Sequence, residues 1–130
     1  MRLIYLGSPY FHKSQSVMDR RVRLTAHCMA HFRRTAENIV IYSPIVQWSR
    51  VALENNLSHE FKTWAQHDFF MIRKASVLWA LTIPGWKESF GLSQEIEYAK
   101  DIGHEVLYVI PEGMDTDGGP NYVLTPDEPT

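Results

Sequence analysis

The chain has 130 residues, with 13 basic and 15 acidic side chains and a formal net charge of -2. This length fits one domain with a single core, and such a charge balance gives no bulk attraction to a nucleic-acid polymer or a membrane surface. The single cysteine, Cys28, excludes an internal disulfide and a cysteine-rich metal site. It also favours a reducing compartment. Because the N-terminus lacks the apolar core of a signal peptide, we expect a cytoplasmic protein without a membrane span.

Short apolar segments alternate along the chain with segments of helical spacing. None of the apolar segments alternates cleanly, which is typical of strands in a parallel sheet covered by helices on both faces. The expected strands are 2–7, 38–42, 76–83 and 105–110. The expected helices are 14–34, 58–74 and 92–101, and a further short helix from Ser49 is left open. This order predicts a single-domain α/β fold with an open, doubly wound parallel sheet in three layers, flavodoxin- or Rossmann-like.

The chain divides into an α/β domain over residues 1–110 and a tail over residues 111–130 that is rich in proline, glycine and aspartate. We expect the tail to be irregular. Two interpretations stay open: a loose chain end, or a segment that reaches a neighbouring subunit through Asn121 and Tyr122.

Each predicted strand is followed by a turn that contains proline. In open parallel sheets, ligands bind beyond the carboxyl ends of the strands, so these turns should converge on one rim. Proline and glycine can simply end strands, but that does not explain the polar and aromatic residues beside them. The turns are Gly7-Ser8-Pro9-Tyr10, Ser43-Pro44, Pro84-Gly85-Trp86 and Pro111-Glu112-Gly113.

Two acids have the spacing of inward-facing helix positions. Asp68 lies four residues after Trp64, and Glu95 lies three after Leu92 and four before Ala99. A buried acid without a partner is costly, so each needs pairing or a functional cleft. For one acid alone, a boundary residue tied to an amide or an arginine explains the spacing equally well; two acids near the same rim favour a site. Glu95 also lies in the first turns of its helix, where the dipole favours its ionised form.

Several other side chains are candidates for this rim. Ser89 and Gly91 precede the helix that carries Glu95, and its free amides suit an anion such as phosphate, although Ser89 also fits a plain helix cap. Trp86 follows a turn and could stack on a base, and Tyr5 and Tyr10 could donate hydrogen bonds. The other tryptophans are expected in the core: Trp48, Trp64 and Trp79.

The histidines carry no metal-binding pattern. His27 and His31 lie four residues apart, but no third ligand accompanies them, so we expect no metal. His67 directly precedes Asp68 in the sequence and is expected to point away from it.

Four pieces of the sequence occur in a familiar order: Ile-Tyr-Leu-Gly-Ser-Pro-Tyr at 4–10, Asp68 in a helix, Pro-Gly-Trp-Lys-Glu-Ser-Phe-Gly at 84–91, and Gln-Glu-Ile-Glu-Tyr-Ala at 94–99. Together they resemble the nucleoside 2-deoxyribosyltransferase-like superfamily, in particular its small bacterial and phage members of unassigned function. The resemblance covers residues 2 to about 110. Each piece alone is weak, and the specificity comes from their order and spacing.

The resemblance implies roles for individual residues. The glutamate that matches Glu95 is the nucleophile, the aspartate that matches Asp68 serves the leaving base or its protonation, and the tyrosine that matches Tyr5 orients the glutamate. Six residues before the glutamate, nucleoside transferases have an aspartate and the 5′-monophosphate N-glycosidases a serine. Ser89 stands there, which favours a nucleotide substrate.

The chain also departs from the superfamily pattern. Its Gly-Ser loop is shorter than in the monophosphate hydrolases and carries Pro9, and Gln47 and Trp48 follow the Ser-Pro-Ile turn where many relatives have histidine. These differences leave the identity of the substrate open.

The function expected from the resemblance is cleavage or transfer at the N-glycosidic bond of a (deoxy)nucleoside or nucleoside 5′-monophosphate, without a metal or cofactor. Hydrolysis and transfer both stay open, as do the sugar and the base. We expect a homodimer or larger homo-oligomer in the cytoplasm, of the host if the protein is phage-encoded. The expected substrate-binding residues are Gly7, Ser8, Pro9, Tyr10, Pro44, Trp86, Ser89 and Gly91.

Two alternatives belong to other functional classes. One is a non-catalytic module that sequesters a nucleotide or a nucleotide-derived signal. The other is a structural or assembly protein with a vestigial cleft. Free base released from a nucleoside would separate the enzyme from both.

Overall fold

The computed structural model describes residues 1–113 and 121–130. In chain order the described residues form β1 (Arg2–Gly7), α1 (Gln15–Thr35), β2 (Ile39–Tyr42), α2 (Pro44–Glu54), α3 (Phe61–Lys74), β3 (Val77–Leu81), α4 (Phe90–Asp101), β4 (Glu105–Glu112) and β5 (Asn121–Thr125). No helix among them is long and apolar enough to cross a membrane.

The strands form one sheet in the order β2-β1-β3-β4-β5. β2, β1, β3 and β4 are parallel, and β5 pairs antiparallel with β4. The chain leaves β1 in one direction to form β2 and returns past it to form β3, so the sheet is doubly wound. The predicted α/β class with a mostly parallel open sheet is therefore confirmed.

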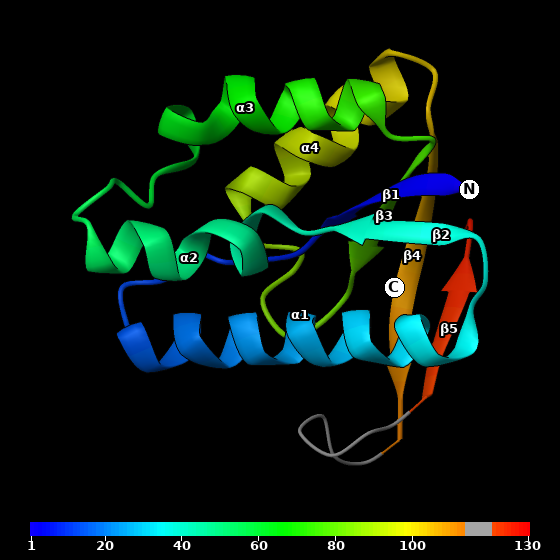
Figure 1. Cartoon of the computed structure of the whole chain (residues 1–130), viewed down its shortest axis with the longest axis horizontal. Coiled ribbons are helices and arrows are strands. Elements are labelled where there is room, and N and C mark those ends of the chain that lie inside the picture. Colours follow the sequence, from blue (N-terminus) through cyan, green and yellow to red (C-terminus); the bar gives the residue numbers. More distant parts are fainter. Residues whose placement is uncertain (114–120) are drawn as a thin grey trace.

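The helices cover both faces of the sheet (Figure 1). α1 lies on one face, whereas α3 and α4 lie on the other. This division follows from the strand order, because right-handed crossovers in opposite directions place their helices on opposite faces. The connection from β1 to β2 runs one way, and the connections to β3 and β4 run the other way.

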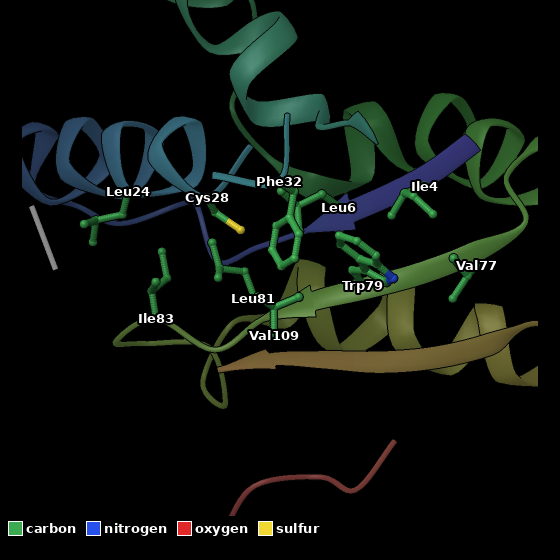
Figure 2. Close-up of a cluster of buried hydrophobic side chains, with 10 residues drawn as sticks. All are labelled: Ile4, Leu6, Leu24, Cys28, Phe32, Val77, Trp79, Leu81, Ile83 and Val109. Carbon is green, nitrogen blue, oxygen red and sulfur yellow. The ribbon is translucent and has the colours of Figure 1, made fainter. Parts of the chain in front are cut away.

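Each face of the sheet has its own core, because successive strand residues point to opposite sides. Ile4 and Leu6 of β1 are buried toward α1, whereas Tyr5 between them is buried in the core beneath α3 and α4. The core beneath α1 is drawn in Figure 2 and comprises Ile4, Leu6, Leu24, Cys28, Phe32, Val77, Trp79, Leu81, Ile83 and Val109. Tyr5 thus lies on the side of the two acid-bearing helices, together with the partly buried Leu3.

α2 begins at Pro44. The sequence had left open a short helix from Ser49, so the observed helix starts earlier than that. Ser43 is its N-cap, with the side-chain oxygen accepting a hydrogen bond from the Val46 amide at 3.2 Å. Proline then takes the first helical position, where its missing N–H costs nothing. In Figure 1, α2 extends beyond the carboxyl end of β2, between the levels of α1 and α3. The helix therefore forms part of the rim where a ligand is expected.

The expectation of an irregular tail is wrong for residues 121–125, which form β5, whereas residues 126–130 are irregular as expected. β4 continues through Pro111, which pairs with Tyr122 of β5, so the predicted turn at 111–113 does not form at Pro111. Proline is tolerated here because β3 pairs with β4 only as far as Val109, so Pro111 has no partner on the β3 side. Residues 114–120 of the predicted tail lie outside the described residues.

Tyr122 packs against α1 of its own chain, so this part of the tail is not a loose chain end. Its ring lies 5.0 Å from that of His31 and 5.9 Å from that of Phe32, centroid to centroid. Its hydroxyl lies 2.7 Å from Nδ1 of His27. β5 is therefore attached to α1 as well as to β4.

Candidate active site

Asp68 and Glu95 meet between the two helices on the same side of the sheet. Asp68 projects from α3 and Glu95 from α4, and each is only 5% exposed. A hydrogen bond joins their side chains. The predicted convergence of two inward-facing acids is therefore confirmed.

Tyr5 fixes the orientation of Glu95. The Tyr5 hydroxyl donates a hydrogen bond to Glu95 Oε2 at 2.7 Å, and the tyrosine itself is 1% exposed. Because Tyr5 is packed in the core of the sheet, this donor has little freedom to move. Glu95 is thus held from β1 on one side and contacted from α3 on the other.

Burial governs the protonation of the pair. It raises the pKa of Glu95 well above its usual range, the neighbouring Asp68 raises it further, and the hydrogen bond from Tyr5 opposes the rise. Burial also raises the pKa of Asp68, against hydrogen bonds with Glu95 and His67 that lower it. Burial therefore outweighs the helix dipole, which we expected to keep Glu95 ionised. The pKa values of both carboxyl groups are therefore raised, which favours their protonated forms.

A glycine lets β1 approach α4 closely enough for this contact. A Cβ on Gly7 would lie 2.8 Å from Leu92 Cδ1 and 3.2 Å from Glu95 Oε1. Gly7 therefore contributes space to the site and does not line the cavity described next. Pro9 is buried and does not line it either.

A cavity of about 350 Å³ opens beside the carboxyl pair, at the carboxyl ends of the strands. This volume lies in the range of small-molecule sites. Of the residues predicted to bind substrate, Ser8, Tyr10, Pro44, Ser89 and Gly91 line it, together with both acids. Most of the predicted site residues therefore line the cavity.

Aromatic side chains form much of the cavity wall. Trp48 of α2 and Trp64 of α3 lie with ring centroids 5.4 Å apart, and both are half-buried. We expected both in the core. Their spacing could have indicated a place in the cavity wall. Trp48 lies four residues after Pro44, and Trp64 lies four before Asp68, so each tryptophan shares a helix face with a predicted site residue. The aromatic residues that line the cavity are Tyr10, Phe11, Trp48, Phe61, Trp64 and Phe90.

Two loops are linked across the mouth of the cavity. The Tyr10 hydroxyl, after β1, lies 3.1 Å from Nδ1 of His59, which precedes α3. His59 was not singled out from the sequence, because nothing in its surroundings there marks it as a partner of Tyr10.

Tyr42 is a second tyrosine beside the carboxyl pair that the sequence did not reveal. It is the last residue of β2, and its ring centroid lies 5.9 Å from that of Tyr5. Its hydroxyl is buried and has no hydrogen-bond partner of good geometry among the described residues. Burial raises the pKa of Tyr42, the indole of Trp48 opposes the rise, and the two nearby carboxyl groups add to it.

Two placements differ from expectation. Trp86 does not line the cavity: its ring packs against Tyr108 at 5.9 Å, with the Lys87 ammonium 5.6 Å from the ring centroid. The Trp86 amide donates to the Ile83 carbonyl at 3.1 Å, and this turn places the indole on the core beneath α4.

His67 was expected to point away from Asp68, but its Nδ1 lies 3.2 Å from Asp68 Oδ1.

The start of α4 forms one edge of the cavity. Ser89 is the N-cap, and its oxygen accepts a hydrogen bond from the Leu92 amide at 3.2 Å, which leaves its hydroxyl hydrogen free to donate. The helix begins at Phe90, so Gly91 lies within its first turn and not before it. A Cβ on Gly91 would lie 3.1 Å from a ring carbon of Phe61, so this glycine lets α3 and α4 pack closely.

The charge of the lining is acidic. Among the described residues, four acids line the cavity and no lysine or arginine does. The acids are Glu60, Asp68, Glu88 and Glu95. The described lining therefore offers no lysine or arginine to pair with a phosphate.

No group of three or more metal-binding side chains occurs in the part of the chain that the structure describes.

Ser8 lines the cavity from the end of β1. It is 7% exposed, and its hydroxyl accepts a hydrogen bond from that of Thr25 in α1 at 3.2 Å. The site is thus built from hydroxyl, carboxyl and aromatic groups.

Residues 2–110 match a family described as a domain of unknown function, DUF1937. The chain belongs to the DUF1937 family. The DUF1937 match begins with β1 and extends into β4, so it includes Tyr5, Asp68 and Glu95. A search of curated proteins finds no match to the chain.

Proposed function

We propose that this protein cleaves or transfers at the N-glycosidic bond of a nucleoside, with Glu95 as nucleophile. The observation that carries the proposal is a buried, hydrogen-bonded carboxyl pair, held by Tyr5 at the wall of an aromatic-lined cavity. The resemblance of the sequence to the nucleoside 2-deoxyribosyltransferase-like superfamily supports the same chemistry.

In the proposed reaction, a Glu95 oxygen bonds to the anomeric carbon through an oxocarbenium-like transition state. The bond between that carbon and the base nitrogen breaks, and its electron pair goes to the base. Asp68 delivers a proton to the departing base. Water then attacks the glycosyl ester in hydrolysis, or a second base attacks it in transfer.

The geometry of the pair suits this division of roles. Burial raises the pKa of both acids, and that of Glu95 the more strongly, so the roles are assigned from geometry. The Tyr5 hydroxyl donates to Glu95 Oε2 at 2.7 Å and would stabilise the ionised nucleophile once substrate is bound. Asp68, on the neighbouring helix, would then carry the proton for the departing base.

The remaining lining residues would position the substrate. The flat rings of Trp48 and Trp64 provide stacking surface for a base. Ser8 and Ser89 offer hydroxyls to the 5′ end of the sugar. The acidic lining favours a nucleoside without phosphate over the 5′-monophosphate that Ser89 suggested in the sequence.

The test is release of free base from a panel of ribo- and deoxyribonucleosides and their 5′-monophosphates, followed by chromatography. We expect release by the wild type, and a loss on the order of 10⁴-fold or more in Glu95→Gln. Glu97→Gln is the matched control, since Glu97 lies on the exposed side of the same helix.

Other outcomes have definite meanings. Full turnover by Glu95→Gln contradicts its role as nucleophile, and full turnover by Asp68→Asn contradicts its role as acid. Tight binding of a nucleotide that is recovered intact would support the non-catalytic module instead.

A further inference from the structure

We propose that the preferred substrate is a nucleoside whose base carries a positive charge, such as an N-alkylated purine or a pyridinium. This inference rests on the proposed function and specifies its substrate class. It follows from two features of the same cavity among the described residues: two buried carboxyl groups in a lining without lysine or arginine, and an aromatic wall beside them.

The negative charge is concentrated at the carboxyl pair. The two acids at the rim have cations nearby: Glu60 Oε2 lies 3.4 Å from Lys62 Nζ, and Glu88 interacts with Arg21. Within the lining, in contrast, no lysine or arginine among the described residues faces Asp68 and Glu95. Two histidines are nearby: His59 lines the cavity, and His67 Nδ1 lies 3.2 Å from Asp68 Oδ1. A cationic ligand would offset the negative charge that these two buried carboxyl groups carry when ionised.

The aromatic wall stands directly beside this charge. Trp64 and Asp68 lie one helical turn apart on α3, so both side chains emerge on the same face. Trp48 lies against Trp64 from α2. Tryptophan faces are the strongest aromatic partners for cations, and aromatic cages with nearby carboxylates recognise quaternary nitrogens. A neutral base would stack there too, but only a cationic one would also satisfy the charge.

A cationic base also changes what the reaction requires. When the bond between the anomeric carbon and the ring nitrogen breaks, its electron pair neutralises the cation, and the base leaves as a neutral molecule. No proton has to be delivered to it. Glu95 is still needed to bond to the anomeric carbon, whereas Asp68 becomes dispensable as an acid. Hydrolysis then consumes one water and releases one proton.

The two substrate classes can therefore be separated with one variant. We would compare 7-methylguanosine with guanosine, and a ribosyl pyridinium with uridine, each as the ribose and 2-deoxyribose form and at slightly acidic pH. Every rate is divided by the spontaneous rate in the same buffer, because cationic nucleosides are intrinsically more labile. Asp68→Asn should lower cleavage of neutral nucleosides on the order of 10²- to 10⁴-fold. It should lower cleavage of the cations by less than about tenfold.

Binding provides a readout that is independent of turnover. In Glu95→Gln, calorimetry should show at least about tenfold tighter binding of 7-methylguanosine than of guanosine. Replacing Trp64 with leucine should reduce this ratio toward one. Equal binding and cleavage of the cationic and neutral partners would overturn the inference while leaving the proposed function intact. No cleavage of any nucleoside would overturn the proposed function, and this inference with it.

Discussion

Glu95 is surrounded by apolar packing, one phenol and one other acid, and its protonation should therefore be visible in the stability of the fold. Its raised pKa means that the folded state binds the proton more tightly than the unfolded chain does. That stability is fully present below the unfolded value, about 4.3. It is lost as the pH rises through the folded pKa.

We therefore expect the wild type to lose stability relative to Glu95→Gln as the pH rises across that window. The measurement is the thermal unfolding midpoint of both proteins at a series of pH values. Glu97→Gln should follow the wild type, because Glu97 is exposed on the same helix. Parallel curves for the wild type and Glu95→Gln would show that Glu95 titrates normally.

Tyr5→Phe removes the hydroxyl that donates to Glu95 and should slow turnover about ten- to hundredfold, the usual value of a hydrogen bond to a charged group. Because that hydrogen bond lowers the pKa of Glu95, its loss should move the acid limb of the kcat/KM profile to higher pH. Tyr98→Phe is the control: its hydroxyl accepts from Arg73 at 2.7 Å, away from the carboxyl pair. An unmoved acid limb in Tyr5→Phe would separate Tyr5 from the ionisation of Glu95.

At the scale of elements, the site depends on the close approach of β1 to α4 at Gly7. Gly7→Ala would press a methyl group against Leu92 and Glu95 and should destabilise the fold by about 1–3 kcal/mol. Activity should fall further than stability alone explains, because Glu95 is displaced. Denaturant unfolding and base release measure the two effects.

Gly103→Ala is the matched control for that substitution. Gly103 has φ +83°, but a Cβ added there would meet no atom within 4 Å, so alanine strains only the backbone. It should lower stability and leave activity per folded molecule unchanged. Equal activity of the two variants would show that the position of Glu95 tolerates movement of β1 against α4.

The elements that the sequence predicted well are those whose pattern is local. The apolar runs of β1 to β4 and the helical stripes of α1, α3 and α4 come from periodicity within one segment. β5 and the early start of α2 were missed for different reasons. β5 follows a stretch rich in glycine and proline and is stabilised by pairing with β4 and by contacts of Tyr122 with α1. α2 starts with a proline, which signals a turn and a first helical position equally well.

The site residues divide in the same way: those marked by a local pattern were predicted, and those placed by long-range packing were not. Helical spacing placed Asp68 and Glu95 inward, and the topology brought them together. The aromatic wall required knowing that α2 packs beyond the carboxyl edge of the sheet, which no local pattern shows. Trp86 was misplaced because a tryptophan after a turn can face either a cavity or a core, and the choice depends on contacts with Tyr108 on a distant strand.

At the scale of the whole molecule, β5 should contribute to the fold and not behave as a loose chain end. Tyr122→Ala removes the contacts with His31, Phe32 and His27 and should cost about 2 kcal/mol, somewhat less than a fully buried aromatic ring. Val123→Ala, at the next and more exposed position of the strand, should cost clearly less. Denaturant unfolding compares them, and equal small effects would mean that β5 is only weakly attached. The expected homo-oligomer stays a prediction.

The central claim is that Glu95 forms a covalent bond to the sugar. Its most direct test is the mass of the intact protein after incubation with a 2′-fluoro analogue of a nucleoside that it cleaves, because the fluorine slows hydrolysis of the glycosyl ester. We predict an added mass equal to the fluorinated sugar, located by peptide mapping on Glu95 and absent from Glu95→Gln. Base release without any adduct, or an adduct on another residue, would contradict the account.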